Sequence, residues 1–434
     1  MSRRSFLFLQ TIASPFFRRL GDGLARRGHR VGKISYCQGD ALYWRGSDVL
    51  AFRGRVDELP DFYTRVYDDR QVSDIVLFGD CRPIHRPAMA LARERGMRSW
   101  VFEEGYLRPG WITLEEGGVN GNSALMRNAD FFRAQASSLP AVPTAEPVRA
   151  GLGWRVAYDI AYNVANYLPP YRYPGYRTHR PYPIWREYRS WISRLVRQPW
   201  ENASARRATE ALLRDALPYY LLPLQLDSDV QIRIHSPFRN VPAAIEAVIA
   251  SFAAHAHDEA GLVIKNHPLD NGMISYRGLI ANYARAHGVA SRVKFLDGGD
   301  LNKLMDHALG VVVVNSTVGL SALQRGRPVI ALGKALYDLD GLTERRGLDC
   351  FWQDPIPPDM ALLDAFLRVL VHHTQINGNY YMLEDIAVGV ENAISRMIRT
   401  PEGKEVGLHL AGGCSSLREA VPRYCSDNRD NSFA

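Results

Sequence analysis

Short apolar runs alternate with amphipathic segments throughout the first part of the chain. Apolar runs occupy residues 5–10, 31–36, 74–78 and 99–102, and helical patterns occupy residues 16–27 and 87–95. Short apolar or alternating runs predict strands, whereas apolar positions three and four residues apart predict helices. Alternation of the two is typical of parallel βαβ units, so a Rossmann-like domain is expected here.

A second series with the same alternation begins near Tyr219. Strands are predicted at residues 231–235, 261–265, 293–295, 311–315 and 329–332, and helices at 243–257, 276–287, 301–307 and 318–324. The predicted fold class is therefore α/β and GT-B-like, with two Rossmann-like domains facing a central cleft. Glycosyltransferases and sugar-nucleotide epimerases share this plan, and their ligands bind at the carboxyl ends of the strands.

The length of 434 residues is too great for one ordinary core and suits two domains. We predict an acceptor-side domain over residues 1–205, which includes a basic aromatic stretch at 151–200. A nucleotide-sugar-binding domain is predicted over residues 206–400. Residues 401–434 are rich in Gly and Ser and are predicted to form a mobile tail.

The positive charge of the chain is concentrated in the basic aromatic stretch. Residues 151–200 hold eight arginines, two acidic residues and twelve aromatic residues, and the whole chain has a net charge of +7. Interleaved Arg, Trp and Tyr suit a bilayer interface, where rings lie at headgroup depth and guanidinium groups meet lipid phosphate. A linker packed on the domains and a site for an acidic acceptor chain are the alternatives. Nucleic acid is not expected as a partner, because no RNP, KH or helix-turn-helix pattern is present.

Several absences indicate the compartment. No apolar run is long enough to span a bilayer. The N-terminal apolar run is interrupted by Gln10 and Pro15, which favours a strand over a signal peptide. The five cysteines are scattered without a CxxC pair, which argues against disulfides and a zinc site. A cytoplasmic location is expected.

Two predicted strands of the second series end in groups suited to a phosphate. Lys265 and His267 follow one strand, where a cation can neutralise a phosphate and an imidazole can hydrogen-bond or protonate it. Asn315, Ser316 and Thr317 follow another and precede a helix, whose N-terminal N–H groups attract anions. An ordinary N-cap would explain the hydroxyl pair alone. Because both groups end strands of one series, a shared phosphate site is predicted.

Carboxylates also end predicted strands. Glu103 and Glu104 precede a glycine in the first half, and Asp227 and Asp229 precede residues 231–235 in the second. A retaining sugar transfer needs a carboxylate near the anomeric carbon and a second group that activates the acceptor hydroxyl. Solvated surface acids are the alternative for each. Asp80 with Arg82 is a weaker candidate of the same kind.

No metal site is predicted. Asp227-Ser-Asp229 and Asp338-Leu-Asp340 have the Asp-x-Asp pattern that binds a divalent metal in the other major transferase fold. Such short pairs arise readily by chance. Helix ends and cations usually compensate phosphate charge in the topology expected here.

Several motifs taken together resemble the KpsS/LipB family of bacterial capsular polysaccharide proteins. They are FEEGYLRPGWITLE, PLQLDSDVQIRIHSPF, LVIKNHPLD, VKFLDGG, VVVVNSTVGLSAL, LGKALYDLDGLT and LDCFW, and the resemblance runs from about residue 5 to about residue 395. The family resembles β-Kdo glycosyltransferases related to KpsC modules. The resemblance implies retaining transfer of Kdo from CMP-Kdo onto a phosphatidylglycerol lipid at the start of the capsule linker, with no cofactor besides the donor.

The resemblance also implies roles for individual residues. Asp229 matches the proposed nucleophile, with Asp227 as the second choice, and Glu103-Glu104 match an acid pair before Gly. His267-Pro268 with Lys265 match the HP motif, in which Asn266 replaces the first proline of the Lys-Pro-His-Pro run of KpsC modules. Ser316-Thr317 match the hydroxyl motif. These residues would act as nucleophile, acceptor- or donor-orienting acid, and phosphate ligands.

The implied setting is the inner face of the bacterial inner membrane. The protein would be peripheral there, with a lipid acceptor and with a KpsC-like Kdo transferase and the capsule export complex as partners. Two other functions share the sequence features. A non-catalytic export or scaffold protein would bind a membrane or partner without releasing CMP, and a sugar-nucleotide epimerase would turn over without an acceptor.

Overall fold

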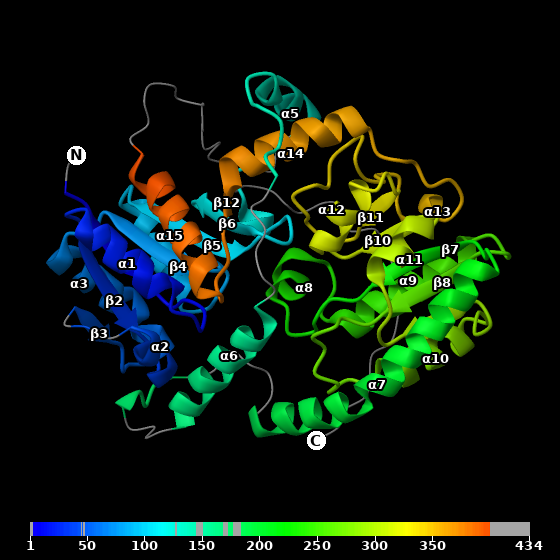
Figure 1. The fold of residues 1–434 in the computed structure, drawn as a ribbon, viewed down its shortest axis with the longest axis horizontal. Coiled ribbons are helices and arrows are strands. Elements are labelled where there is room, and N and C mark those ends of the chain that lie inside the picture. Colours follow the sequence, from blue (N-terminus) through cyan, green and yellow to red (C-terminus); the bar gives the residue numbers. More distant parts are fainter. Residues whose placement is uncertain are drawn as a thin grey trace. The chain divides into compact units, whose positions relative to one another are not determined.

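Seven strands of the described residues form a sheet that is parallel except at one edge (Figure 1). The computed structural model describes residues 3–44, 46, 48–125, 128–144, 151–167, 172–176 and 184–399. The strand order is β12-β6-β5-β4-β1-β2-β3, and β6 pairs antiparallel with both β5 and β12. The strands are β1 (Ser5–Phe8), β2 (Arg30–Ser35), β3 (Val49–Ala51), β4 (Asp74–Phe78), β5 (Arg98–Glu104), β6 (Trp111–Glu116) and β12 (Gln375–Asn377).

The helices of this part lie in the connections between the strands. They are α1 (Phe16–Arg26), α2 (Gln38–Tyr43), α3 (Leu59–Arg70), α4 (His85–Glu94) and α5 (Ala129–Ala136), with the 3₁₀ turns η1 (Val56–Glu58) and η2 (Asn120–Asn122). α1 buries its apolar side, including Phe16, Phe17 and Leu20, as its three- and four-residue spacing predicts. The apolar side of α1 thus packs onto the sheet, where it contacts β2.

The second sheet is parallel throughout, in the order β11-β10-β7-β8-β9. Its strands are β7 (Tyr219–Pro223), β8 (Gly261–Lys265), β9 (Val293–Leu296), β10 (Gly310–Val313) and β11 (Val329–Ala331). The helices are α8 (Val230–His235), α9 (Val241–His255), α10 (Tyr276–Ala286), α11 (Leu301–His307), α12 (Thr317–Leu323), α13 (Leu348–Phe351) and α14 (Met360–Thr374). Every residue of β7 and β10 is buried, as expected for strands covered on both faces.

The predicted GT-B-like α/β fold class is confirmed, because two mainly parallel sheets flanked by helices follow each other along the chain. The expected strand at residues 231–235 is wrong. The alternating pattern there belongs to helix α8, since the Asp229 side chain caps it by accepting a hydrogen bond from the Gln231 N–H. The first strand of the second sheet is β7 instead.

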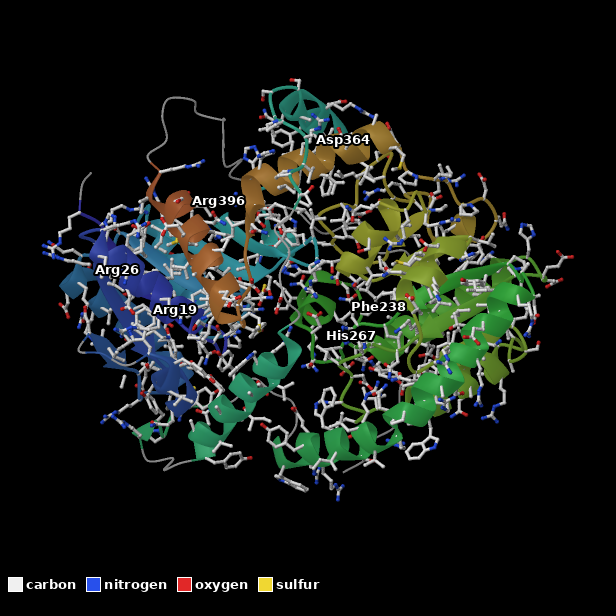
Figure 2. The ribbon with its side chains drawn as sticks, viewed as in Figure 1. Arg19, Arg26, Phe238, His267, Asp364 and Arg396 are labelled. Atoms are coloured by element: carbon white, nitrogen blue, oxygen red, sulfur yellow. The ribbon has the colours of Figure 1, made fainter. Side chains whose placement is uncertain are left out.

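The chain divides differently from the predicted boundaries. The boundary predicted at residue 205 falls inside the long helix α7 (Ile184–Arg214), which follows α6 (Leu152–Tyr167). β12 and α15 (Leu383–Ile398), expected in the second domain, join the first sheet, and α15 (orange-red) lies against the blue elements in Figure 1. The Arg396 guanidinium, labelled in Figure 2, donates to the Gln375 carbonyl and ties α15 to β12. The predicted tail at 401–434 lies outside the described residues.

Candidate functional site

The order of the second sheet brings three of the predicted segments to one edge. β7 lies between β8 and β10, so the residues that follow β7 run between the loops that follow its two neighbours. The Leu224 N–H donates to the Lys265 carbonyl at 2.9 Å and continues this pairing beyond the strand. Asp229 therefore lies in the segment flanked by the His267 loop and the Ser316 loop, as the convergence of parallel strand ends requires.

The two aspartates of the second half have different surroundings. Asp229 is the N-cap of α8, and its Oδ1 accepts from the Gln231 N–H at 2.9 Å. Burial raises the pKa of Asp229, while the Gln231 N–H, the Gln225 side chain and the charge of Arg108 oppose this rise. Asp227 instead accepts from the Val241 N–H at 3.0 Å and faces Arg233 at 3.7 Å. Asp227 thus stabilises the segment before α9. Asp229 instead interacts electrostatically with Arg108.

The acid pair of the first sheet meets this aspartate. Burial raises the pKa of Glu103 to about 7, and the charges of Glu104 and Asp229 add to the rise. The end of β5 and the start of α8 therefore lie within electrostatic range of each other. Glu104 forms an ion pair with Arg155 of α6, whose Nη1 lies 3.2 Å from its Oε1. The two sheets therefore contribute one carboxylate cluster.

His267 is held as a neutral imidazole. Burial lowers the pKa of His267 to about 4, and the charges of Lys265, Arg108, Arg155 and Arg194 act in the same direction. The Leu269 N–H donates to Nδ1 at 3.0 Å, so the proton of the neutral ring is on Nε2. His267 is labelled in Figure 2. Its Nε2–H is a hydrogen-bond donor, which suits an oxyanion.

Lys265 lies behind this loop in the structure. Its side chain is buried, and its Nζ donates to the Asn266 carbonyl at 3.3 Å. Burial lowers the pKa of Lys265, and the charge of Asp297 opposes this change. The ammonium group thus adds positive charge to the wall of the site.

A buried ion pair holds the His267 loop to the second sheet. Arg194 of α7 donates from both terminal nitrogens to Asp297, at 3.0 and 2.7 Å. Asn266 donates to Asp297 at 3.1 Å and to Asp270 at 3.2 Å. The asparagine that replaces a proline in this motif therefore links the loop to two carboxylates. Bidentate pairing with a guanidinium fixes orientation as well as charge.

Arg194→Met is expected to lower the free energy of unfolding by about 3 kcal/mol, because it leaves the buried Asp270 and the partly buried Asp297 without their cation. Arg197 lies on the exposed side of the same helix. Arg197→Met should therefore leave the midpoint of urea unfolding close to that of the wild type. Equal midpoints for both variants would mean that the Arg194 pair does not support the fold.

The three residues of the loop before α12, Asn315, Ser316 and Thr317, have different roles. Ser316 caps α12, since its Oγ accepts from the Val318 N–H at 3.2 Å. The amide of Asn315 is used internally, because its Oδ1 accepts from Gln225 at 3.0 Å and its Nδ2 donates to the Gln231 carbonyl at 2.9 Å. Asn315 thus positions Gln225 and α8. Thr317 lines a pocket instead.

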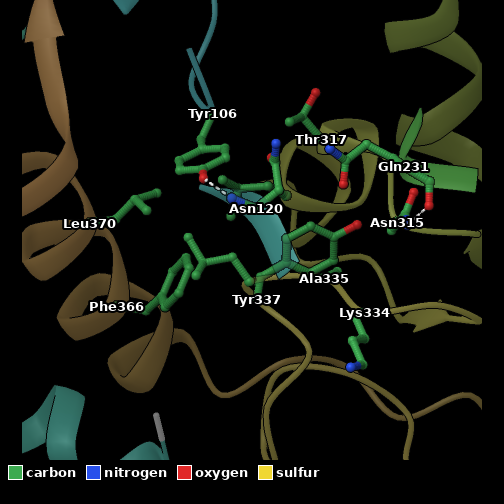
Figure 3. A pocket seen from close by; sticks show the side chains of 12 residues that line it. Tyr106, Asn120, Gln231, Asn315, Thr317, Lys334, Ala335, Tyr337, Phe366 and Leu370 are labelled. Atoms are coloured by element: carbon green, nitrogen blue, oxygen red, sulfur yellow. Dashed lines mark hydrogen bonds between the residues drawn. The ribbon is translucent and has the colours of Figure 1, made fainter. Parts of the chain in front are cut away.

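That pocket is lined by side chains from both parts of the chain (Figure 3). Tyr106 and Asn120 come from the first half, and Thr317, Lys334 and Tyr337 come from the second. The Tyr106 hydroxyl accepts from the Asn120 N–H at 2.6 Å and donates to Glu115 at 2.8 Å. These two hydrogen bonds fix the side of the pocket that the first half contributes. Gln231 and Asn315 also line it, so the pocket adjoins the carboxylate cluster.

Two arginines of the site were missed by the motif analysis. Arg108 acts electrostatically on Asp229 and on His267, and Arg155 acts on both glutamates. Arg108 lies within the FEEGYLRPGWITLE segment, so its proximity to the acid pair was a usable signal. Arg155 was counted only as part of the basic stretch. Its ion pair with Glu104 depends on the packing of α6 in the folded chain, which the sequence pattern does not reveal.

The weaker candidate Asp80 has a structural role. Its Oδ2 accepts from the Val119 N–H at 3.2 Å and from Asn122 at 3.0 Å. The next residue, Cys81, lies with its Sγ 3.4 Å from Nε2 of His235 at the end of α8. This contact joins the end of β4 to the second half. Among the described residues, no group of three or more His, Cys, Asp or Glu side chains is arranged to hold a metal ion.

Comparison with known families matches residues 73–381 to the family described as "Capsule polysaccharide biosynthesis protein". This match covers more than half of the chain. The chain belongs to this family. It is 36% identical over 384 residues to the "Capsule polysaccharide export protein KpsS" of Escherichia coli, covering 88% of this chain and 98% of that protein.

Two further relatives extend the comparison. The "Capsule polysaccharide modification protein LipB" of Neisseria meningitidis serogroup B is 35% identical over 388 residues, covering 88% of this chain and 92% of that protein. The solved structure "Thermosulfurimonas dismutans KpsC, beta Kdo 2,7 transferase" is 14% identical, covering 91% of this chain and all of that one, with a TM-score of 0.42. The sequence relatives confirm the predicted family resemblance, while the structural likeness is too weak to add to it.

Proposed function

We propose that this capsule protein is a retaining glycosyltransferase that transfers Kdo from CMP-Kdo to a phosphatidylglycerol-type lipid and so starts the capsule linker. The observation that carries the proposal is that Asp229, the N-cap of α8, lies within electrostatic range of Glu103 of the first sheet, beside a pocket that both halves of the chain line. A retaining transferase needs this pairing of a nucleophilic carboxylate with a second acid–base group. The choice of donor and acceptor is supported by the motif resemblance to Kdo transferases.

In this mechanism an Asp229 carboxylate oxygen forms a bond to the anomeric carbon of Kdo. The bond between that carbon and the phosphate oxygen breaks, and CMP leaves with the electron pair. The acceptor hydroxyl then attacks the same carbon, gives its proton to Glu103 and releases Asp229 as a carboxylate. Two displacements at one carbon restore the starting configuration.

The other residues would stabilise the departing phosphate. The Nε2–H of His267 would donate to a phosphate oxygen, while Lys265 and Arg108 contribute positive charge and Thr317 a hydroxyl. Ser316 and Asn315 would act indirectly, through α12 and Gln225. Preorganised donors and cations of this kind lower the barrier because they require little rearrangement as charge develops.

The pH dependence should identify the base. The pKa of Glu103 is about 7, so kcat/KM should rise with pH through a midpoint near 7 as this carboxyl loses its proton. Glu103→Gln should remove the rising limb and lower kcat/KM about 100-fold or more. The variant should be at least as stable as the wild type at pH 8, because a raised folded-state pKa means that ionisation of Glu103 opposes folding above its unfolded pKa.

A matched control is available in Glu115. Burial also raises the pKa of Glu115 to about 7, but its oxygens accept hydrogen bonds from Tyr106 and Ser123. Glu115→Gln should therefore keep the rising limb. If Glu115→Gln lost the rise of kcat/KM with pH while Glu103→Gln kept it, the group that titrates near pH 7 would be Glu115.

The proposal is tested by following CMP release from CMP-Kdo with and without short-chain phosphatidylglycerol. We expect release that depends on the lipid. Turnover without any acceptor would indicate an epimerase-like or hydrolytic reaction. Tight lipid binding without CMP release, under conditions where a related transferase is active, would indicate an export scaffold. The proposed acceptor places the reaction at the inner face of the inner membrane, together with a KpsC-like transferase and the export complex.

A further inference from the structure

Exposed apolar side chains are concentrated on α6 and on the first half of α7. None of the helices in the described part of the chain is both long and apolar enough to cross a bilayer. The exposed apolar residues on these two helices are Trp154, Val156, Ile160, Val164 and Tyr167 of α6 and Trp185, Ile192, Leu195, Val196 and Trp200 of α7. A concentration of large exposed apolar side chains of this kind marks an interaction site.

The spacing of most of these residues places them on one face of each helix. On α6, Val156, Ile160 and Val164 are four residues apart, which forms one stripe. On α7, Ile192, Val196 and Trp200 have the same spacing. In Figure 1 the first half of α7 lies along the lower edge of the view, and α6 runs from the lower left towards the centre.

The opposite faces pack against the protein. On α7, Glu187, Arg194 and Ala205 are buried, whereas Ile192 is 64% and Trp200 is 70% exposed. On α6, the Tyr162 hydroxyl contacts the Cys37 Sγ at 2.9 Å beside α2, and Ala165 is buried. The two helices are therefore anchored on one side only, and their apolar stripes point away from the core.

The charge around the apolar stripe of α7 is positive. Arg186, Arg189 and Arg197 of α7 are exposed. The described part of the basic aromatic stretch presents little negative charge to solvent. Glu187 is buried, and Asp159 is only partly exposed. Charge complementarity therefore favours an anionic occupant.

The apolar character ends within α7. Beyond Trp200 the exposed positions of the helix are mainly polar, and they include Ser204, Arg206, Arg207 and Glu210. The contrast between the two halves of one helix indicates a bounded surface.

We propose that the outer faces of α6 and the first half of α7 bind an anionic lipid bilayer at headgroup depth. Large aromatic rings flanked by arginines favour this interface, because the rings sit at the headgroup level while the guanidinium groups meet lipid phosphate. The inner faces of the same helices carry Arg155 and Arg194, which contact Glu104 and Asp297 of the site. The bilayer surface would thus lie one helix away from the carboxylate cluster.

Bilayer binding itself is independent of the proposed function. The further suggestion that bilayer binding delivers a lipid acceptor to the site rests on the proposed function. Vesicle binding without donor and transfer with donor are therefore separate measurements, and one can fail while the other succeeds.

The experiment is co-sedimentation of the full chain with vesicles made of equal parts phosphatidylcholine and phosphatidylglycerol, without CMP-Kdo. The wild type should bind these vesicles, bind pure phosphatidylcholine more weakly and lose binding as salt increases. The variant Trp185→Ser/Ile192→Ser/Trp200→Ser should bind at least about tenfold more weakly, because it removes apolar insertion. Arg186→Gln/Arg189→Gln/Arg197→Gln should show a similar loss on anionic vesicles only.

The matched control removes three exposed apolar residues elsewhere. Ile356, Met360 and Leu383 are each 51% exposed. Their triple change to Ser should leave vesicle binding unaltered. Circular dichroism should show the same folded spectrum for every variant, because each change lies on an exposed side chain.

Three results would overturn the proposal. The first is a wild type that does not bind anionic vesicles, and the second is a Trp185/Ile192/Trp200 variant that binds as well as the wild type. The third is a wild-type dimer that this variant converts to a monomer while vesicle binding stays unchanged. That result would assign the face to a second copy of the chain.

Discussion

Asp229→Asn is expected to lower transfer by at least about a thousandfold while the fold stays intact, because removal of a nucleophile disables both displacements. The structure favours Asn over Ala for this test. Asp229 caps α8 through its Oδ1, and the amide oxygen of Asn can accept the same hydrogen bond from the Gln231 N–H. Loss of activity would therefore report on the missing carboxylate and not on a frayed helix.

Asp227→Asn is the control for this prediction. Asp227 has the same chemistry two residues earlier, but its carboxylate accepts from the Val241 N–H and faces Arg233. Transfer rates and urea unfolding of the two variants should be compared under the same conditions. An active Asp229→Asn variant together with an inactive Asp227→Asn variant would assign the nucleophile to Asp227.

His267→Ala should lower kcat/KM for the donor about 100-fold, because it removes a fixed hydrogen-bond donor to the departing phosphate. The ring is oriented by the Leu269 N–H, which donates to Nδ1 and leaves the Nε2–H free. His267→Gln keeps an N–H donor on a side chain of similar reach and should recover part of the rate. Equal rates for the wild type and His267→Ala would exclude this role.

The charge state of His267 can be measured separately. Because its pKa is lowered to about 4, the imidazole should stay neutral from pH 5.5 upward. In protein with labelled histidine, the His267 resonance, assigned from the His267→Ala spectrum, should not titrate between pH 5.5 and 8. A midpoint near the ordinary value of about 6.5 would mean that neither burial nor the surrounding cations lower the pKa of His267.

Three parallel strands of the second sheet, β8, β10 and β11, could be read from the sequence because nearly all their residues are buried. The predicted strand at residues 261–265 has the same bounds as β8, where an unbroken apolar run ends at Lys265. Once such strands are known to be parallel, their carboxyl ends must lie at one edge. The proximity of the His267, Asp229 and Ser316 segments follows from that topology.

Other parts of the site could not be predicted because they depend on packing between distant segments. Arg155 reaches Glu104 only because α6 packs beside the first sheet, and Arg194 is buried against Asp297, although both were assigned to a surface stretch. The segment at 231–235 alternates as a strand does, yet the capping aspartate makes it a helix. β12 and α15 return to the first sheet through contacts that local patterns do not encode.

The central claim concerns the product, so the most direct test is its structure. Purified protein should be incubated with CMP-Kdo and short-chain phosphatidylglycerol, and the lipid product should be analysed by nuclear magnetic resonance. We predict a Kdo-lipid formed in equal amount to the CMP released, with the sugar in the anomeric configuration that it had in the donor. A product of inverted configuration, or no Kdo-lipid where a related transferase forms one, would contradict the account.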